Sequence, residues 1–427
     1  MTWSKEKISQ YLFYLLVFLL PWQTRWIITD PPLFGGVWEY GRLSLYGWDI
    51  VLAVLAVLTA PQLWRECKLM LGRSPGFRVF VLLAALAYLT GAWAAEPLLS
   101  TYWGLRLVEG GVLWLLVRVV RPRFSVVCWS LAAAGALQAA WGVAQFATQD
   151  TLASKWLGVA VHPVLQGGTS VLLNEAGRWL RAYGGQVHPN ALGGLLVITS
   201  LATAWQYVSQ KFTSKKHSYA LLLLLVLQLA GLFVSFSRGA WLALLVTLGF
   251  WWLVQRSDRR LLWPVVLLTA FIFVLFGSML WQPTKERILG NTSRLEQQAL
   301  EERVGGVGES QSLLKGAWWR GVGMGNYTKA LAQHTPGLAA YRYQPVHNLF
   351  LLILTELGII GLGLFLWFLW LRLAPRFTRH WLFLLPIFVT ALFDHYWWTS
   401  ASMSLLFWLV MALGDQLTSD AAPDSSW

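Results

Sequence analysis

The stretch QPVHNLFLLILTELGIIGLGLF, residues 344–365, decides the fold class of this chain. From Leu349 onward nearly every residue is apolar, and a run of this length matches a helix that crosses lipid. His347 and Asn348 stand at its beginning, and Glu356 lies deeper in the run. Polar and ionisable groups are costly in such a segment, so their presence indicates a functional site.

The composition agrees with a membrane protein. Of the 427 residues, 56% are hydrophobic and only 12% are charged, whereas a soluble chain carries about 25% charged residues. The 28 tryptophans suit interfacial belts and saccharide-stacking surfaces. Cys67 and Cys128 provide neither a disulfide framework nor a metal cluster. The N-terminal MTWSKEK leads into an apolar run without a small-residue cleavage site, so we expect a first membrane helix there.

Apolar segments of suitable length recur along the chain and predict an all-α polytopic membrane protein with about twelve transmembrane helices. A large extracytoplasmic loop precedes the tenth. The expected spans are about 8–28, 48–64, 77–95, 104–120, 124–147, 188–209, 218–236, 238–255, 261–281, 346–371, 380–397 and 398–414. The resulting parts are helices 1–5 (1–147), an outer loop (148–187), helices 6–9 (188–281), the large outer loop (282–345), helices 10–12 (346–414) and a cytoplasmic tail (415–427).

Basic residues predict the orientation in the membrane. One set of loops is rich in Lys and Arg, and the alternate short loops contain far fewer. We therefore expect the basic loops and both chain ends in the cytoplasm, and both long loops outside it. The basic loops contain Arg65, Lys68, Arg73 and Arg78; Arg118, Arg121 and Arg123; Lys211, Lys215 and Lys216; Arg256, Arg259 and Arg260; and Arg372, Arg376 and Arg379.

This orientation explains part of the net charge of +13, which therefore does not indicate nucleic acid. The outer segment 282–345 nevertheless holds eight Lys or Arg against five Glu, and the orientation rule requires none of them. A cationic outer loop favours an anionic ligand. The alternative is a solvated loop with balanced ion pairs.

Two motifs place polar residues at the outer ends of expected helices. In SFSRGAWLAL, residues 235–244, Arg238 either snorkels to a lipid phosphate or directs its guanidinium at the phosphate of a substrate. In RAYGGQVHPNALGGLL, residues 181–196, His188 or Asn190 either caps the next helix or belongs to a site, and Arg181 lies in the loop just outside.

Two further motifs fall on the same outer side. GVGMGNY, residues 321–327, is either a simple turn or a set of backbone N–H groups for an anion. LFDHYWWTS, residues 392–400, places Asp394 and His395 in an outer turn, either as a hydrogen-bonded turn or as a wall of the pocket of His347. The sequence has no Walker loop, no His/Cys/Asp cluster with metal-ligand spacing and no glycosidase-like pair of carboxylates, so we expect no metal and no cofactor.

Together, SFSRGAWLAL, HPNALGGLL, GVGMGNY and VHNLFLLILTELGIIGLGLF resemble the motifs of the O-antigen ligase and O-antigen polymerase family of bacterial envelope proteins. They follow the family's order and cover residues 181–365. The topology, with a large outer loop before the histidine helix, is also similar, whereas the first 150 residues carry no matching motif.

The resemblance implies an inverting, metal-independent glycosyltransferase of the bacterial inner membrane. Such proteins take a glycan from an undecaprenyl-diphosphate carrier and pass it to an acceptor hydroxyl on a lipid or another glycan. The resemblance assigns the general base to His347 and diphosphate binding to Arg238 and to Arg303 in the large loop. The loop spacing is longer here than in the family, so Arg294 and Arg320 are alternatives to Arg303.

Arg181, Asn348 and Asp394 are expected to bind substrate beside these residues. The chemistry is consistent, because a diphosphate leaves readily when arginines stabilise its charge, and a neutral imidazole accepts the acceptor's proton. A polymerase with the same donor is one alternative. A transporter of a small anion such as bicarbonate is another; it would use deep ionisable groups, of which Glu109 and Glu356 are the main examples here. We expect Glu356 to pair with a polar group of a neighbouring span.

Overall fold

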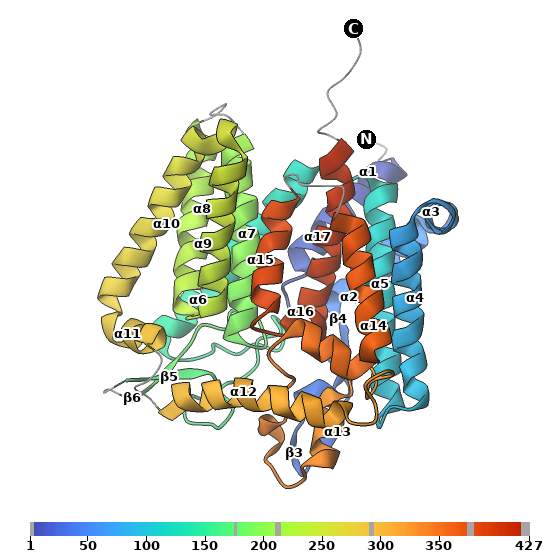
Figure 1. Cartoon of the computed structure of the whole chain (residues 1–427). Coiled ribbons are helices and arrows are strands. Elements are labelled where there is room, and N and C mark those ends of the chain that lie inside the picture. Colours follow the sequence, from blue (N-terminus) through green and yellow to red (C-terminus); the bar gives the residue numbers. More distant parts are fainter. Residues whose placement is uncertain (1–3, 175–176, 210–214, 290–293, 374–379, 420–427) are drawn as a thin grey trace.

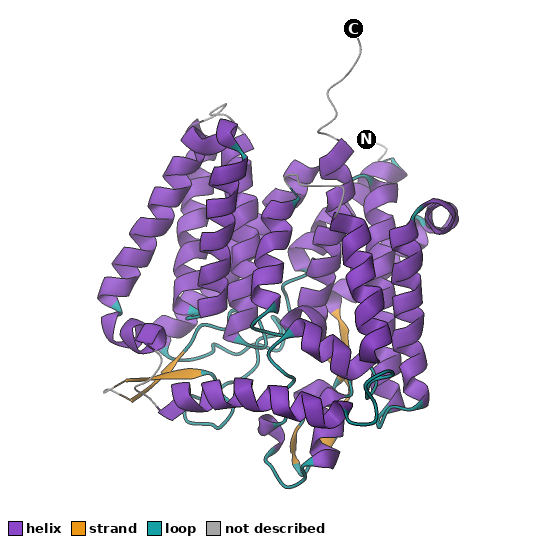
Figure 2. Ribbon diagram, in the orientation of Figure 1, coloured by secondary structure: helices purple, strands orange, loops and turns teal. Residues whose placement is uncertain are grey.

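The chain is mainly α-helical, as the sequence predicts, with three small antiparallel sheets that it does not predict (Figure 1, Figure 2). The computed structural model describes residues 4–174, 177–209, 215–289, 294–373 and 380–419. The predicted tail, 415–427, lies largely outside these residues. The apolar helices together with the sheets place most polar loops at the two ends of the helices.

The longer helices are α1 (Lys5–Leu19), α2 (Gly47–Leu58), α3 (Ala60–Arg73), α4 (Pro75–Leu89), α5 (Pro97–Val120), α6 (Phe124–Thr148), α7 (Pro189–Ser209), α8 (Lys215–Val234), α9 (Arg238–Val254), α10 (Arg259–Met279), α12 (Arg294–Leu314), α14 (Leu349–Leu373), α15 (Trp381–Ala391) and α17 (Ala401–Ser419). The shorter ones are α11 (Trp281–Leu289), α13 (Tyr327–His334) and α16 (Tyr396–Thr399). The strand pairs are β1 (Arg25–Thr29) with β4 (Leu43–Tyr46), β2 (Pro32–Leu33) with β3 (Gly36–Val37), and β5 (Val171–Asn174) with β6 (Gly177–Leu180).

The two faces of the molecule differ in content. Figure 1 shows the start of α1 and the end of α17 on one face, and α11, α12, α13 and the β5–β6 hairpin on the opposite face. This arrangement agrees with the expectation that both chain ends lie on one side and both long loops on the other. All loops that carry the predicted site residues belong to the second face, which we call the loop face.

Helix α7 is the centre of the helical core, because every residue from 189 to 208 is buried. Small residues allow its close packing. A Cβ on Gly193 would lie 2.7 Å from the Cβ of Ser237, and one on Gly194 would collide with the Tyr396 hydroxyl oxygen. The first turn of α7 is thereby held against α9 and α16 at the loop face.

Among the residues that the structure describes, six helical segments are long and apolar enough to cross a membrane: residues 75–92, 124–148, 189–209, 217–234, 259–279 and 349–373. The bent pair α2 and α3 gives a seventh if it counts as one span, and α9, α15 and residues 401–414 are shorter apolar helices. The chain is therefore a multi-pass membrane protein. The number of twelve spans and the placement of the loops remain predictions.

Two N-terminal spans differ from the prediction. The first, expected at 8–28, ends at Leu19, and β1 begins at Arg25. The second, expected at 48–64, bends by 84° between α2 and α3. Pro61 lies in the first turn of α3, where the missing N–H cannot continue the hydrogen bonding of α2. Beyond the bend, α3 carries four charged residues, which favour a position outside the hydrocarbon.

The segment 282–345, predicted to be the large outer loop, is mostly helical where it is described. Helix α12 covers Arg294–Leu314. It packs on α13 and α14, and Figure 1 shows it running across the loop face. Arg303 on α12 is thereby brought next to elements that are far away in the sequence.

The tenth predicted span is broken rather than continuous. Gly358 in α14 has φ 68° and ψ −174°, a backbone conformation that is essentially restricted to glycine. The glycine-rich turn packs into the break, since the N–H groups of Val322 and Gly323 donate to the carbonyls of Thr355 and Glu356, each at 2.9 Å. The sequence motif GVGMGNY therefore completes a broken helix.

The carboxylate of Glu356 lies 2% exposed beside this turn. It accepts a hydrogen bond from Trp398 Nε1 at 2.9 Å, which confirms the expected polar partner from a neighbouring segment. The backbone N–H groups of Gly325 and Tyr327 face the same carboxylate. The group that the glycine-rich turn faces is thus the side-chain carboxyl group of Glu356.

We expect Gly358→Ala to destabilise the protein strongly. A Cβ at Gly358 would collide with the backbone carbonyl of Trp319, and the conformation alone costs about 1–3 kcal/mol for other residues. Gly363→Ala is the matched control, because nothing lies within 4 Å of its Cβ position in the same helix. Thermal unfolding in detergent, followed by size-exclusion chromatography, should show a lower Tm for Gly358→Ala only. Equal Tm values would contradict the break in α14.

The orientation predicts different accessibility of two glycines with open surroundings. No atom lies within 4 Å of the Cβ positions of Gly72 on α3 and Gly308 on α12. In a Cys67→Ser background, we expect Gly308→Cys in whole spheroplasts to react with an impermeant maleimide and Gly72→Cys to react only after permeabilisation. Cys128 is buried and needs no replacement. The opposite labelling pattern would place the loop face in the cytoplasm.

Candidate active site

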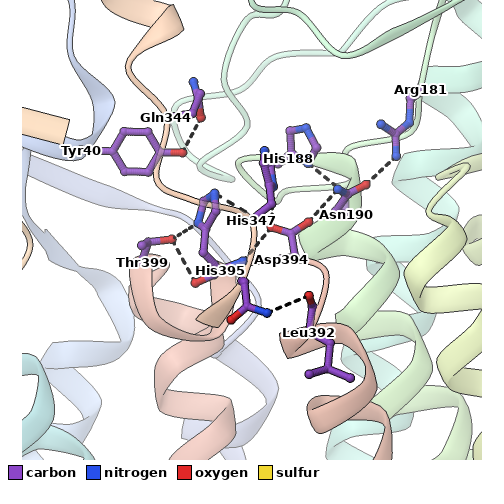
Figure 3. Close-up of polar contacts among 11 residues, drawn as sticks. Tyr40, Arg181, His188, Asn190, Gln344, His347, Leu392, Asp394, His395 and Thr399 are labelled. Atoms are coloured by element: carbon purple, nitrogen blue, oxygen red, sulfur yellow. Dashed lines mark hydrogen bonds and ion pairs between the residues drawn. The ribbon is translucent and has the colours of Figure 1, made fainter. Parts of the chain in front are cut away.

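Three ionisable side chains meet at the start of α14 (Figure 3). His347 precedes α14, and Asp394 and His395 lie in the turn between α15 and α16. The Nδ1 atom of His347 is 3.7 Å from Asp394 Oδ1, and His395 Nε2 is 4.0 Å from the same oxygen. The structure thus brings together His347 and Asp394, which the sequence analysis offered as parts of one pocket.

Asp394 ends a hydrogen-bonded chain that begins at Arg181. Arg181 Nη2 donates to Asn190 Oδ1, and Asn190 Nδ2 donates to Asp394 Oδ2, both at 2.7 Å. Arg181 also donates to Ser170 Oγ and to the carbonyl of Ser235, both at 2.8 Å. One carboxylate oxygen of Asp394 is therefore fixed, while the other faces the two histidines.

The HPN segment has both of the roles that its sequence left open. His188 Nδ1 accepts the backbone N–H of Asn190 at 3.1 Å and so caps α7. The side chain of Asn190 instead connects Arg181 with Asp394, as Figure 3 shows. Proline at the first position of α7 fixes this geometry, because its φ is already that of a helix.

The electrostatics of the cluster keep Asp394 ionised. Burial alone would raise the pKa of the Asp394 carboxyl, but the neighbouring His347, together with the charges of His395 and His188, holds this pKa well below its usual range. Burial lowers the pKa of His395 to about 4, although Asp394 opposes that shift. At neutral pH the cluster therefore contains a carboxylate beside a neutral His395.

A pocket beside Asp394 collects the arginines of the loop face. Its lining includes Arg238 from the start of α9, Arg287 from α11 and Arg303 from α12, together with Asn190 and Asp394. Two of these arginines, Arg238 and Arg303, are those that the resemblance assigned to the diphosphate. We call this the arginine pocket. Guanidinium groups in such a pocket attract a phosphate by charge and bind it with paired hydrogen bonds.

Arg287 is a pocket residue that the sequence analysis did not select. Arg238 Nη1 donates to the carbonyl of Arg287, and Arg287 Nε donates to the carbonyl of Phe236, both at 3.0 Å. These bonds hold α11 against the turn between α8 and α9, where Phe236 has φ 50°. The only sequence signal for Arg287 was its membership of the eight basic residues of segment 282–345.

Asn348 has a structural role at the edge of the site. Its Oδ1 accepts the N–H of Leu351 at 2.9 Å, which caps α14, and its Nδ2 donates to the carbonyl of Leu392 at 3.1 Å. Arg181 is only 4% exposed, and it donates hydrogen bonds to Asn190, Ser170 and the carbonyl of Ser235. The observed contacts fix the elements that carry His347 and Asp394, and the expected binding of substrate by both residues stays a prediction.

The structure distinguishes among the loop arginines that the sequence offered. Arg303 lines the arginine pocket. Arg320 lies elsewhere, with its guanidinium carbon 6.0 Å from the ring centre of Trp93 and 5.9 Å from that of Trp319. The side chain of Arg294 lies outside the described residues. Of Arg303 and Arg320, Arg303 is therefore the one that shares the arginine pocket with Arg238.

The cluster could also hold a cation. His347, Asp394 and His395 each offer one ligand atom, and these atoms lie within 4.8 Å of one another. Sequence spacing did not indicate this group, because His347 is far along the chain from the other two.

A family model described as O-antigen ligase matches residues 223–366, which confirms the resemblance. The matched segment includes Arg238, Arg303 and His347, and excludes Arg181 and Asp394. No curated protein matches the chain. The family implies an enzyme that transfers glycans at a membrane.

Proposed function

We propose that this chain, in which residues 223–366 belong to the O-antigen ligase family, transfers a glycan from an undecaprenyl-diphosphate carrier to an acceptor hydroxyl. The reaction inverts the anomeric carbon and takes place at the extracytoplasmic face of the bacterial inner membrane. His347 is the general base, Arg238 and Arg303 bind the diphosphate, and Asp394 orients His347. The reaction requires neither a metal nor a cofactor.

The arginine pocket is the observation that carries this proposal. Arg238 and Arg303 share it with Asp394, and Asp394 at the same time faces His347 at 3.7 Å. Transfer from a diphosphate needs cations where the leaving group becomes charged and a base where the acceptor loses its proton. In this proposal Arg238 and Arg303 provide the cations on one side of the Asp394 carboxylate, and His347 provides the base on the other side.

The proposed transfer needs no general acid to protonate the leaving group. The acceptor oxygen attacks the anomeric carbon from the face opposite the carrier, and the bond between this carbon and the diphosphate oxygen breaks. The electron pair leaves with undecaprenyl diphosphate, whose charge the arginines stabilise. His347 accepts the proton of the acceptor hydroxyl.

Asp394 gives His347 the correct tautomer in this proposal. A carboxylate facing Nδ1 favours the proton on that nitrogen and leaves Nε2 as the proton acceptor. Nδ1 of His347 is buried and has no hydrogen-bond partner among the described residues, and hydrogen bonds of catalytic groups often shorten when substrate binds. Arg181 and Asn190 act through Asp394 and are positioning residues.

The two alternative functions, an O-antigen polymerase and a small-anion transporter, make different demands on the site. An O-antigen polymerase would need the same donor site and differ only in its acceptor. A small-anion transporter would need ionisable groups available deep in the membrane. Glu109 instead pairs with Arg106 at 2.7 Å, and Glu356 accepts the hydrogen bond from Trp398. These contacts favour transfer over transport.

The test is transfer in proteoliposomes that contain the purified chain and an undecaprenyl-diphosphate-linked glycan. A lipid A core acceptor and a second carrier-linked glycan are offered separately. Product with the lipid acceptor alone supports a ligase, and product with the carrier-linked acceptor supports a polymerase. Product with neither acceptor, from protein that binds the donor, would contradict the proposed reaction.

A further inference from the structure

The group of His347, Asp394 and His395 has the arrangement of a metal site. Each of the three residues offers one candidate ligand atom, and these atoms lie within 4.8 Å of one another. His347 Nδ1 is 3.7 Å and His395 Nε2 is 4.0 Å from Asp394 Oδ1. Zinc bonds of about 2.0–2.2 Å to nitrogen and oxygen place tetrahedral ligands about 3.3–3.6 Å apart. Small rotations of the two imidazole side chains would bring the three atoms to these separations.

The surroundings of the group resemble those that orient metal ligands. His395 Nδ1 contacts Thr399 Oγ1 at 2.8 Å, which leaves Nε2 directed at Asp394. The second oxygen of Asp394 accepts the hydrogen bond from Asn190. Metal-binding imidazoles and carboxylates usually have such partners on their other atoms. His347 Nδ1 is buried without a hydrogen-bond partner among the described residues, so this nitrogen is available to a metal ion that replaces its proton.

We infer that His347, Asp394 and His395 bind a divalent transition-metal ion, for which Zn²⁺ is the best match, and that this binding inhibits the enzyme. Two imidazoles and one carboxylate suit Zn²⁺ and leave a fourth position open. The arginine pocket next to Asp394 weakens the attraction for a cation, so we expect micromolar rather than tighter binding.

Inhibition rests on the proposed function, whereas binding does not. A metal ion on His347 Nδ1 would replace the proton that Asp394 favours on that nitrogen. The proton of the neutral ring would then lie on Nε2, and Nε2 could no longer accept a proton from the acceptor hydroxyl. The metal would also compete with His347 for the carboxylate of Asp394. The site would therefore act as an inhibitory site, while the transfer itself needs no metal.

The test is calorimetric titration of Zn²⁺ into the full chain, purified in detergent without a polyhistidine tag. We expect one Zn²⁺ per chain, and binding at least about 10-fold weaker in His395→Asn, since even outer partners of metal ligands contribute about 10- to 100-fold. His334→Asn, in an exposed histidine of α13 on the loop face, is the matched control and should bind as the wild type does. Titration with Co²⁺, followed by its visible absorption, gives an independent measure of tetrahedral coordination.

Transfer is then measured with and without Zn²⁺ in the wild type and in both variants. We expect Zn²⁺ to remove most of the activity of the wild type and of His334→Asn, to leave that of His395→Asn largely unchanged, and to be reversed by a chelator. Absence of specific Zn²⁺ binding, or equal binding by His395→Asn, would overturn the inference. Binding with no transfer under any condition would instead contradict the proposed function and leave the metal site established.

Discussion

His347→Gln is expected to lower the rate of glycan transfer by about 10²- to 10⁴-fold, the usual contribution of a positioned general base. Glutamine retains a hydrogen-bonding group near Asp394 but cannot accept a proton from the acceptor hydroxyl. Binding of the carrier-linked donor should change little, because the arginine pocket does not include His347. Single-turnover transfer in proteoliposomes and a separate donor-binding measurement separate the two effects.

The pH profile distinguishes base catalysis from positioning. A base must be neutral to accept a proton, so the wild-type rate should rise with pH, and His347→Gln should lose that rise. The low pKa of Asp394 keeps that residue ionised near neutral pH, so it does not contribute to the rise. His334→Gln should retain both the rate and the profile. A near-normal rate with an unchanged profile in His347→Gln would show that another group is the base.

Arg238→Lys is expected to lose transfer activity by about 10²- to 10³-fold, as when one donor to a developing oxyanion is removed. Lysine keeps the charge but has no planar pair of N–H groups for two phosphate oxygens. The variant should still fold, because lysine keeps a donor for the carbonyl of Arg287, to which Arg238 Nη1 donates. Initial rates and thermal unfolding of the same preparation measure both properties.

Arg303→Ala should have a similar effect, and Arg320→Ala is its control. Arg303 lines the arginine pocket, whereas Arg320 lies against Trp93 and Trp319. We therefore expect Arg320→Ala to retain most of the activity. Full activity in both Arg238→Lys and Arg303→Ala would show that the diphosphate does not bind in the arginine pocket.

The membrane class could be predicted because it depends on composition and on the length of apolar runs. The breaks within these runs could not. Residues 349–373 are apolar on both sides of Gly358, and hydropathy does not show that this glycine has a positive φ. The bend after α2 has a local signal in Pro61 and the charges of α3, which an apolar window averages out.

The site residues likewise divide into those that could be predicted from the sequence and those that could not. His347 and Arg238 could be identified because each stands beside an apolar run, where a polar group is costly. The contact of Asp394 with Asn190 could not be predicted from the sequence, because it depends on how α7 packs against the turn after α15. Arg287 was missed for the same reason, and so was the grouping of His347, Asp394 and His395 as candidate metal ligands. Helix packing brings residues from distant segments together, and single-sequence patterns do not contain that information.

The most direct test of the central claim is the chemistry of the products made by the wild-type chain from a carrier-linked glycan of known anomeric configuration. The account predicts that the new glycosidic bond, determined by NMR, has the opposite configuration, and that the carrier is released as undecaprenyl diphosphate with both phosphates. A bond of retained configuration, or a carrier released with one phosphate, would contradict direct attack by an acceptor that His347 deprotonates.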